Sequence, residues 1–355
     1  YHNSTLALDA DTGEIVWYYQ HLNDHWDLDH PFERMLVDTA VTPDPAEVSW
    51  INPRLQPGQD GVEDAGGLRQ DAQAQEQVLY LSIVDNNGSP ITDIDEDEVV
   101  VQWDGEDTKT LDFEQPSWPI RITVFVDNSN AAIPAVPQMR EGLRAFLSEL
   151  PEEVEVGLST IAGRAQWVAE HTSDRTDLER GIGLIVPNTG SAADFLDALV
   201  EEGGRLDDDD DREYYPVIVI LSADGVEGSS SQQGRFDEMV NRMIMNSAET
   251  HTLFFVSGNG SGAAAIQVQI GEALAQNTRG SFSRFATTNG FVNQLTELAR
   301  DLTNKHRMVS NQYRVTYRQP RNPSAQPAIG VATTREGLNM IPTLDGNVPA
   351  RMPQP

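Results

Sequence analysis

The chain has 355 residues, enough for two or three domains with a sizeable core. Its 56 acidic and 24 basic residues give a formal net charge of −32, which argues against binding to nucleic acids or to anionic lipid surfaces. No apolar run reaches the roughly 18 residues of a membrane-spanning helix. Because cysteine is absent, disulfides, thiolate metal sites and cysteine nucleophiles are excluded.

The first 60 residues are rich in Trp, His, Asp and Pro and carry a distinctive local pattern. Residues 7–17 read A-x-D-x-x-T-G-x-x-x-W, which predicts a strand, a tight turn and a returning strand. The sequence DHWD follows at residues 24–27. Together these features resemble a propeller blade of the pyrroloquinoline quinone (PQQ) dehydrogenases. The resemblance implies that Asp27 is a general base that acts with PQQ and Ca²⁺.

Residues 1–60 supply about one blade, whereas the resemblance implies a propeller of about eight blades. A lone blade cannot bury its own faces. Two interpretations therefore remain. The segment is a remnant or part of a PQQ-dependent alcohol or sugar dehydrogenase, or it is a non-catalytic fragment whose tryptophans pack against the rest of the chain. Residues 61–77 contain few large apolar side chains and read as a linker.

Residues 78–118 predict a small β-module. The side chains of residues 78–84 divide between the two faces of a strand, and the turn sequence DNNG follows at residues 85–88. Further strands are expected at residues 99–103 and 108–113, joined by Asp104 and Gly105. Residues 85–114 contain eleven acids and a single base, Lys109. This composition indicates a solvated acidic face or, alternatively, a calcium-dependent surface.

Residues 119–305 change to an alternation of strand-like and helix-like runs, which is typical of a parallel-rich α/β sheet with helices on both faces. The run at residues 217–221 is continuously apolar, as expected of a strand covered on both faces. The other expected strands are residues 122–126, 156–161, 252–256 and 281–285. Residues 306–355 form a C-terminal segment with strand candidates at 312–318 and 329–333.

Oxygen-bearing side chains follow two of these strands. Asp127 and Ser129 come directly after the first strand, and Asp224 follows the strand at residues 217–221. In open α/β sheets, ligands bind at the carboxyl ends of the strands. The loop at residues 187–191 adds further hydroxyl groups, so the set suits Mg²⁺, Ca²⁺ or Mn²⁺.

Residues 119–305 resemble a von Willebrand factor type A domain, and residues 78–318 together resemble the subgroup typical of acidobacteria. The metal-ion-dependent adhesion site of this family reads D-x-S-x-S, followed by a Thr and a later Asp. Asp127 and Ser129 match the first two positions, and Asp224 matches the last. Ser191, or alternatively Thr189, falls in the Thr region. Ala131 stands where the second Ser is expected.

The resemblance implies a non-catalytic, periplasmic or secreted bacterial module that binds a protein partner through the upper loops of the sheet. A divalent cation would be held by Asp127, Ser129, Ser191 and Asp224, and an acidic side chain of the partner would complete its coordination. Because Ala131 offers no oxygen, the sequence predicts weak metal binding or, alternatively, a degenerate site that has lost the metal.

Overall fold

The computed structural model describes residues 4–8, 15–20, 76–103, 105–209, 211–230, 234–256, 265–318, 329–344, 346 and 348. The chain divides into two compact units, residues 1–51 with 324–327, and the remainder. In the first unit, β1 (Ser4–Leu8) pairs antiparallel with β2 (Ile15–Gln20). This pairing agrees with the two predicted strands, and the predicted turn between them lies outside the described residues. Asp27 and the predicted linker up to residue 75 lie outside the described residues.

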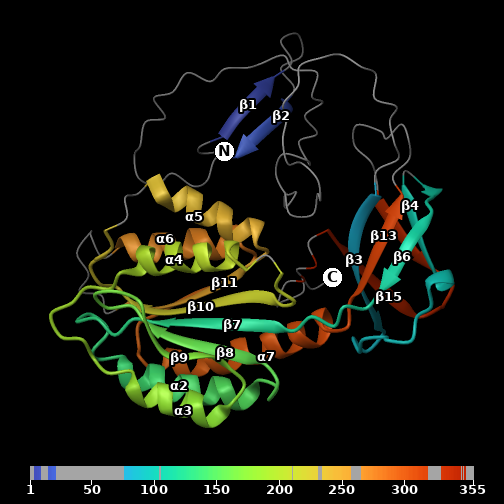
Figure 1. The fold of residues 1–355 in the computed structure, drawn as a ribbon. Helices are drawn as coiled ribbons and strands as arrows, with labels where there is room; N and C mark the ends of the chain where they lie inside the picture. Colours follow the sequence, from blue (N-terminus) through green and yellow to red (C-terminus); the bar gives the residue numbers. More distant parts are fainter. Residues whose placement is uncertain are drawn as a thin grey trace. The chain divides into compact units, whose positions relative to one another are not determined.

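The second unit contains an α/β part built on a six-stranded sheet (Figure 1). Its strand order is β12-β11-β10-β7-β8-β9. All neighbouring strands are parallel except β8 and β9, which are antiparallel. The bounds are β7 Ile120–Val126, β8 Glu155–Thr160, β9 Gln166–Thr172, β10 Tyr215–Ala223, β11 Glu249–Phe255 and β12 Phe282–Phe285.

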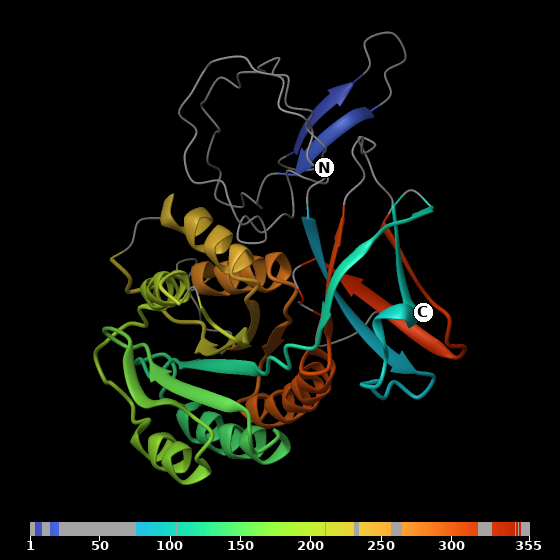
Figure 2. The same cartoon turned by 45° about the vertical axis from the view of Figure 1, so that its right-hand side comes forward.

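Helices cover both faces of this sheet, which confirms the predicted layered α/β architecture. Figure 1 shows α4, α5 and α6 on one face and α2, α3 and α7 on the other, and the rotated view of Figure 2 agrees. The bounds are α2 Val136–Glu149, α3 Arg175–Leu184, α4 Phe195–Asp207, α5 Gly234–Met245, α6 Ala265–Asn277 and α7 Gly290–Val309.

The two-sided cover explains the apolar strands. Every residue of β10 is buried. On one face, Val219 and Leu221 join the core beneath α2 and α7. On the other face, the rings of Phe195 in α4 and Phe254 in β11 lie 5.8 Å apart. Since both faces of a central parallel strand exclude water, its sequence is continuously apolar rather than alternating.

The β-module contains two sheets that share one core. One sheet has the order β15-β3-β13-β6 and the other β14-β4-β5. Residues of β3, β4 and β13 contribute to the same buried cluster, so the sheets pack face to face. The bounds are β3 Glu76–Asp85, β4 Val99–Trp103, β5 Glu106–Asp107, β6 Thr110–Glu114, β13 Tyr313–Arg318, β14 Ile329–Thr333 and β15 Leu338–Thr343.

Two features of these sheets differ from the simplest sequence interpretation. The strand predicted at residues 108–113 is observed as β6, which pairs with β13, and the two residues before the predicted strand form the additional short strand β5, which pairs with β4. The C-terminal strands do not form a separate segment, because β13 and β15 flank β3 on either side. A strand as buried as β3 needs a hydrogen-bonded neighbour on both edges.

The topology fixes where a ligand would bind. The chain passes from β7 to β8 on one side and later returns to β10 on the other side of β7. The strand order therefore reverses between β7 and β10, and such a switch point opens a crevice at the carboxyl ends of the strands. Asp127 and Asp224 immediately follow these two strands.

Candidate functional site

Asp127 is the central acid of the crevice and is completely buried. Its backbone N–H donates to Leu221 O at 2.8 Å, which fixes the strand end against β10. Its Oδ1 accepts a hydrogen bond from the backbone N–H of Ser129 at 2.8 Å. Its Oδ2 accepts from Ser222 Oγ at 3.1 Å and from the backbone N–H of Ala223 at 3.2 Å. The carboxylate therefore bridges the ends of both strands.

Burial raises the pKa of Asp127 above its ordinary value, and the hydrogen bonds from Ser129, Ala223 and Ser222 oppose that rise. A buried carboxylate of this kind is stabilised as the anion by a nearby positive charge. A cation in the crevice would supply that charge and keep Asp127 ionised.

Asn128 joins the neighbouring loops. Its Nδ2 donates to Val186 O at 2.8 Å, and its Oδ1 accepts from the backbone N–H of Ala162 at 3.2 Å. Its backbone carbonyl accepts from the N–H of Asn188 at 2.7 Å. Through its side chain and its backbone carbonyl, Asn128 thus holds two segments against the loop that follows β7. These segments are the loop before α4 and the residues just after β8.

The loop before α4 places Ser191 beside the crevice. Its carbonyl accepts a hydrogen bond from the backbone N–H of Asn130 at 3.1 Å, and the residue is half-buried. Thr189, the alternative for the same position, is exposed. Asp224 is half-buried, and its backbone N–H donates to Phe255 O at 3.0 Å. The structure therefore brings Asp127, Ser129, Ser191 and Asp224 to the same edge of the sheet.

Ala131 packs tightly against the loop that follows β10. A Cβ added to Gly225 would lie 2.7 Å from Ala131 Cβ, so only glycine fits at position 225. Ser129 Oγ lies 3.8 Å from the same Cβ position. This hydroxyl oxygen is buried and forms no well-aligned hydrogen bond with any described residue, although it lies close enough to the Asp127 carboxylate to lower the pKa of that group. A buried hydroxyl without a well-aligned partner is costly, and it fits a site where a hydroxyl oxygen binds a cation.

Sequence reasoning missed Gln267, a buried residue near the start of α6. Its Oε1 lies 4.0 Å from the Gly225 Cβ position and forms no well-aligned hydrogen bond with the described residues. No motif marks this residue, because α6 is far from β7 in sequence and meets the crevice only through tertiary packing. Within the described residues, no group of three or more His, Cys, Asp and Glu is placed to hold a metal. The candidate set relies instead on two carboxylates together with hydroxyl and amide oxygens.

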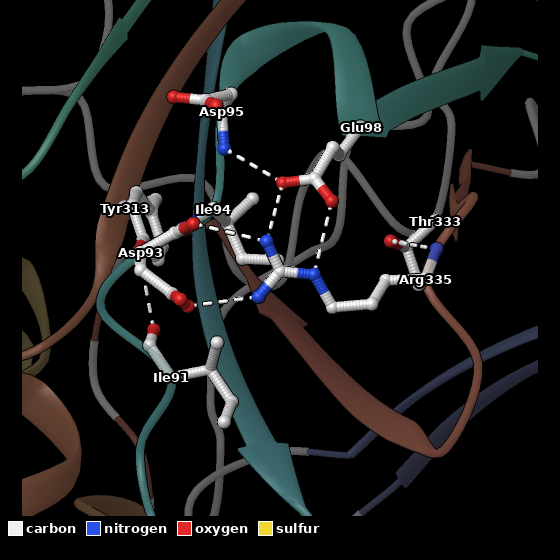
Figure 3. Close-up of polar contacts among 8 residues, drawn as sticks. All are labelled: Ile91, Asp93, Ile94, Asp95, Glu98, Tyr313, Thr333 and Arg335. Carbon is white, nitrogen blue, oxygen red and sulfur yellow. Dashed lines mark hydrogen bonds and ion pairs between the residues drawn. The ribbon is translucent and has the colours of Figure 1, made fainter.

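In the acidic β-module, the side chain of Arg335 lies between two carboxylates (Figure 3). Arg335 Nε and Nη2 donate to the two carboxylate oxygens of Glu98 at 2.9 and 2.6 Å. Arg335 Nη1 donates to Asp93 Oδ1 at 2.8 Å. The guanidinium group places one positive charge between these two carboxylates. The calcium-dependent surface at residues 85–114 stays a prediction.

The architecture is similar to those of known α/β domains. A von Willebrand factor type A structure from Catenulispora acidiphila is 10% identical, with a TM-score of 0.44, and the match covers 75% of this chain and 72% of that one. The protein BatB from Bacteroides thetaiotaomicron is 13% identical (TM-score 0.38), and the match covers 50% of this chain and 96% of that one. An aerotolerance-related membrane protein from Bacteroides fragilis is 12% identical (TM-score 0.37), with coverages of 50% and 97%.

No family model and no curated protein sequence matches the chain. Because these TM-scores are below 0.5, the similarities in fold do not indicate a function. The candidate site is therefore defined only by the residues of this chain. Among the residues that the structure describes, no helix is both long and apolar enough to cross a bilayer. The predicted general base Asp27 lies outside those residues, so its role stays a prediction.

Proposed function

We propose that this protein is a non-catalytic binding module that contacts a partner protein through the loops at the carboxyl edge of its α/β sheet. The observation that carries this proposal is the apolar character of those loops. Val226 is 60% exposed, Val186 57% and Ile133 36%. Leu184, at the end of α3, is 58% exposed. Exposed apolar side chains gathered around a crevice are typical of a contact surface.

The proposed contact includes a weakly held divalent cation. Asp127, Ser129, Ser191 and Asp224 offer carboxylate and hydroxyl oxygens, the ligands that Mg²⁺ and Mn²⁺ prefer. The buried Ser129 Oγ, which has no well-aligned hydrogen-bond partner among the described residues, supports this assignment. When bound, the cation would supply an open coordination position for a carboxylate of the partner. We expect weak binding, because Ala131 replaces a hydroxyl ligand with a methyl group.

A peptide selection tests the proposed surface. A displayed random-peptide library is selected on the wild-type protein in millimolar Mg²⁺, and the enriched peptides are then measured against two variants. Val226→Asp places a charge in the proposed surface. Met245→Asp is the matched control, because Met245 is also an exposed apolar residue (37%) but ends α5, at the opposite edge of the sheet.

We expect the enriched peptides to bind the wild type and Met245→Asp equally and Val226→Asp at least tenfold more weakly. Thermal melting should show that both variants stay folded, since exposed substitutions rarely change stability by more than about 0.5 kcal/mol. Peptides that bind all three proteins equally would contradict the proposed surface.

A second candidate function rests on the N-terminal pattern. The described β1–β2 hairpin is compatible with part of a propeller blade, in which Asp27 would act as base with PQQ and Ca²⁺. A dehydrogenase of this type would also be periplasmic or secreted, the location that we propose for the binding module.

A further inference from the structure

Two buried oxygens beside Gly225 point to a ligand that the sequence did not reveal. Gln267 is 0% exposed and Ser129 1%. Gln267 Oε1 and Ser129 Oγ form no well-aligned hydrogen bond within the part of the chain that the structure describes, although buried polar atoms almost always have a partner. Both atoms lie within 4.0 Å of the Cβ position that Gly225 lacks. They therefore face the same small region at the end of β10.

The orientation of the Gln267 amide is fixed by chemistry. Its Nε2 donates to Glu227 Oε2 at 2.9 Å and, at 3.4 Å, to the backbone carbonyls of Ala193 and Val226. A carbonyl and an ionised carboxylate can only accept hydrogen bonds, so the amide nitrogen must face these groups. The amide oxygen consequently faces away from them, on the side of Gly225.

Gln267 Oε1 lies on the same side of Gly225 as Ala131, the residue that lacks the hydroxyl group expected at its position. Ala131 Cβ lies 2.7 Å from the Gly225 Cβ position, and Gln267 Oε1 lies 4.0 Å from it. These two distances place the amide oxygen within about 6.7 Å of the Ala131 Cβ, the carbon that would carry a hydroxyl at residue 131. Carboxamide oxygens bind hard divalent cations as hydroxyl oxygens do.

We propose that Gln267 Oε1 is a direct ligand of the divalent cation at Asp127, Ser129 and Asp224, and that it substitutes for the hydroxyl missing at Ala131. This assignment rests on the proposed function, because it concerns the same cation. It adds a ligand from α6 and makes Glu227 a positioning residue, since the Glu227 carboxylate orients the Gln267 amide.

The experiment is a Mn²⁺ titration of the whole chain, in which the electron paramagnetic resonance signal reports free Mn²⁺. The variant Gln267→Met removes the amide oxygen from a side chain of similar length. The variant Gln267→Glu restores an oxygen ligand but not the Nε2 donors to Glu227. Gln312→Met is the matched control, because Gln312 is equally buried (0%) but bonds to Tyr215, at the opposite end of β10.

We expect Gln267→Met to weaken Mn²⁺ binding at least tenfold, the lower end of the loss seen when even an outer-shell partner is removed. Gln312→Met should bind within twofold of the wild type. Gln267→Glu should bind Mn²⁺ more tightly than Gln267→Met, because it restores an oxygen ligand, but more weakly than the wild type, because its carboxylate faces the Glu227 carboxylate and two backbone carbonyls. Circular dichroism confirms the fold of each variant.

Three outcomes would overturn the assignment. If Gln267→Met binds Mn²⁺ as the wild type does, the amide oxygen is not a ligand. If Gln267→Glu recovers none of the binding that Gln267→Met loses, an oxygen at this position does not bind the cation. In both cases, loss of binding in Asp127→Asn would leave the proposed cation site standing. If the wild type binds no Mn²⁺ at millimolar concentration, both this assignment and the proposed cation fail.

Discussion

Lys305 and Glu249 form a buried ion pair whose disruption provides the sharpest test of the packing. The side chain of Lys305 is 0% exposed and that of Glu249 1%. Lys305 Nζ donates to Glu249 Oε2 at 2.5 Å and to Val348 O at 2.7 Å, so it also fixes a residue beyond β15. His251 Nε2 lies 3.1 Å from Glu249 Oε1. Burial alone would raise the pKa of Glu249, but Lys305 and His251 outweigh it and lower the pKa to about 2.

The substitution Lys305→Met leaves Glu249 buried without its cation. Breaking a buried pair in this way costs about 3–5 kcal/mol, which corresponds to a fall in melting temperature of about 6–20 °C for a domain of this size. In the wild type, the pair stabilises the fold above the ordinary pKa of 4.5 and loses that effect as the pH falls toward 2. In the variant, the pKa of Glu249 should instead rise, so that protonation relieves the buried charge.

Urea denaturation at pH 7 and pH 5 measures both effects. We expect the deficit of Lys305→Met in free energy of unfolding to be smaller at pH 5 than at pH 7. The double variant Lys305→Met with Glu249→Leu should recover most of the loss, because an apolar pair removes the uncompensated charge. A single variant that loses less than about 1 kcal/mol, or the same amount at both pH values, would refute this reasoning.

Three further predictions concern other parts of the chain. Gly225→Ala should lower the free energy of unfolding by about 1–3 kcal/mol, because the new methyl group overpacks against Ala131. The second substitution Ala131→Gly should restore the unfolding midpoint. If the midpoint does not recover, the two residues are not in close contact. Arg335→Gln should lower the denaturation midpoint of the β-module, because it removes the ion pairs with Glu98 and Asp93. The difference from the wild type should shrink in high salt, which screens such pairs. An unchanged midpoint would show that these pairs contribute nothing to stability. Purified protein given PQQ and Ca²⁺ should not reduce a dye with alcohols or sugars; turnover that Asp27→Asn abolishes would instead favour the dehydrogenase.

The sequence predicted the parts of the fold whose signals are local. The apolar run at residues 217–221 identified a strand covered on both faces, and the position of Asp127 after the first strand located the crevice. The sequence analysis missed the edge strand β9. Most of its residues are only half-buried, and polar side chains interrupt its apolar ones, so the strand contains no continuous apolar run. The strand β15 was missed because Pro342 lies within it; the strand order shows β15 at a sheet edge, where proline is tolerated.

The candidate site was only partly predictable for a related reason. Asp127, Ser129 and Asp224 lie at strand ends that the alternation of elements identifies. Gln267 enters the site through the packing of α6, and its importance depends on the direction of one amide group. No sequence pattern encodes that direction, because it is set by Glu227 and two backbone carbonyls from distant loops.

The central claim is that the crevice between β7 and β10 holds a divalent cation, and Ser129→Ala tests it most directly. Because Ser129 Oγ forms no well-aligned hydrogen bond with the described residues, its removal should change the melting temperature without metal only slightly. In the wild type, Mg²⁺ at about ten times its dissociation constant should add about 1.4 kcal/mol, or a few degrees beyond NaCl of equal ionic strength. Ser129→Ala should lose this increment, and Ala131→Ser should enlarge it. If Mg²⁺ and NaCl give equal shifts in the wild type and in Ala131→Ser, the crevice is not a cation site.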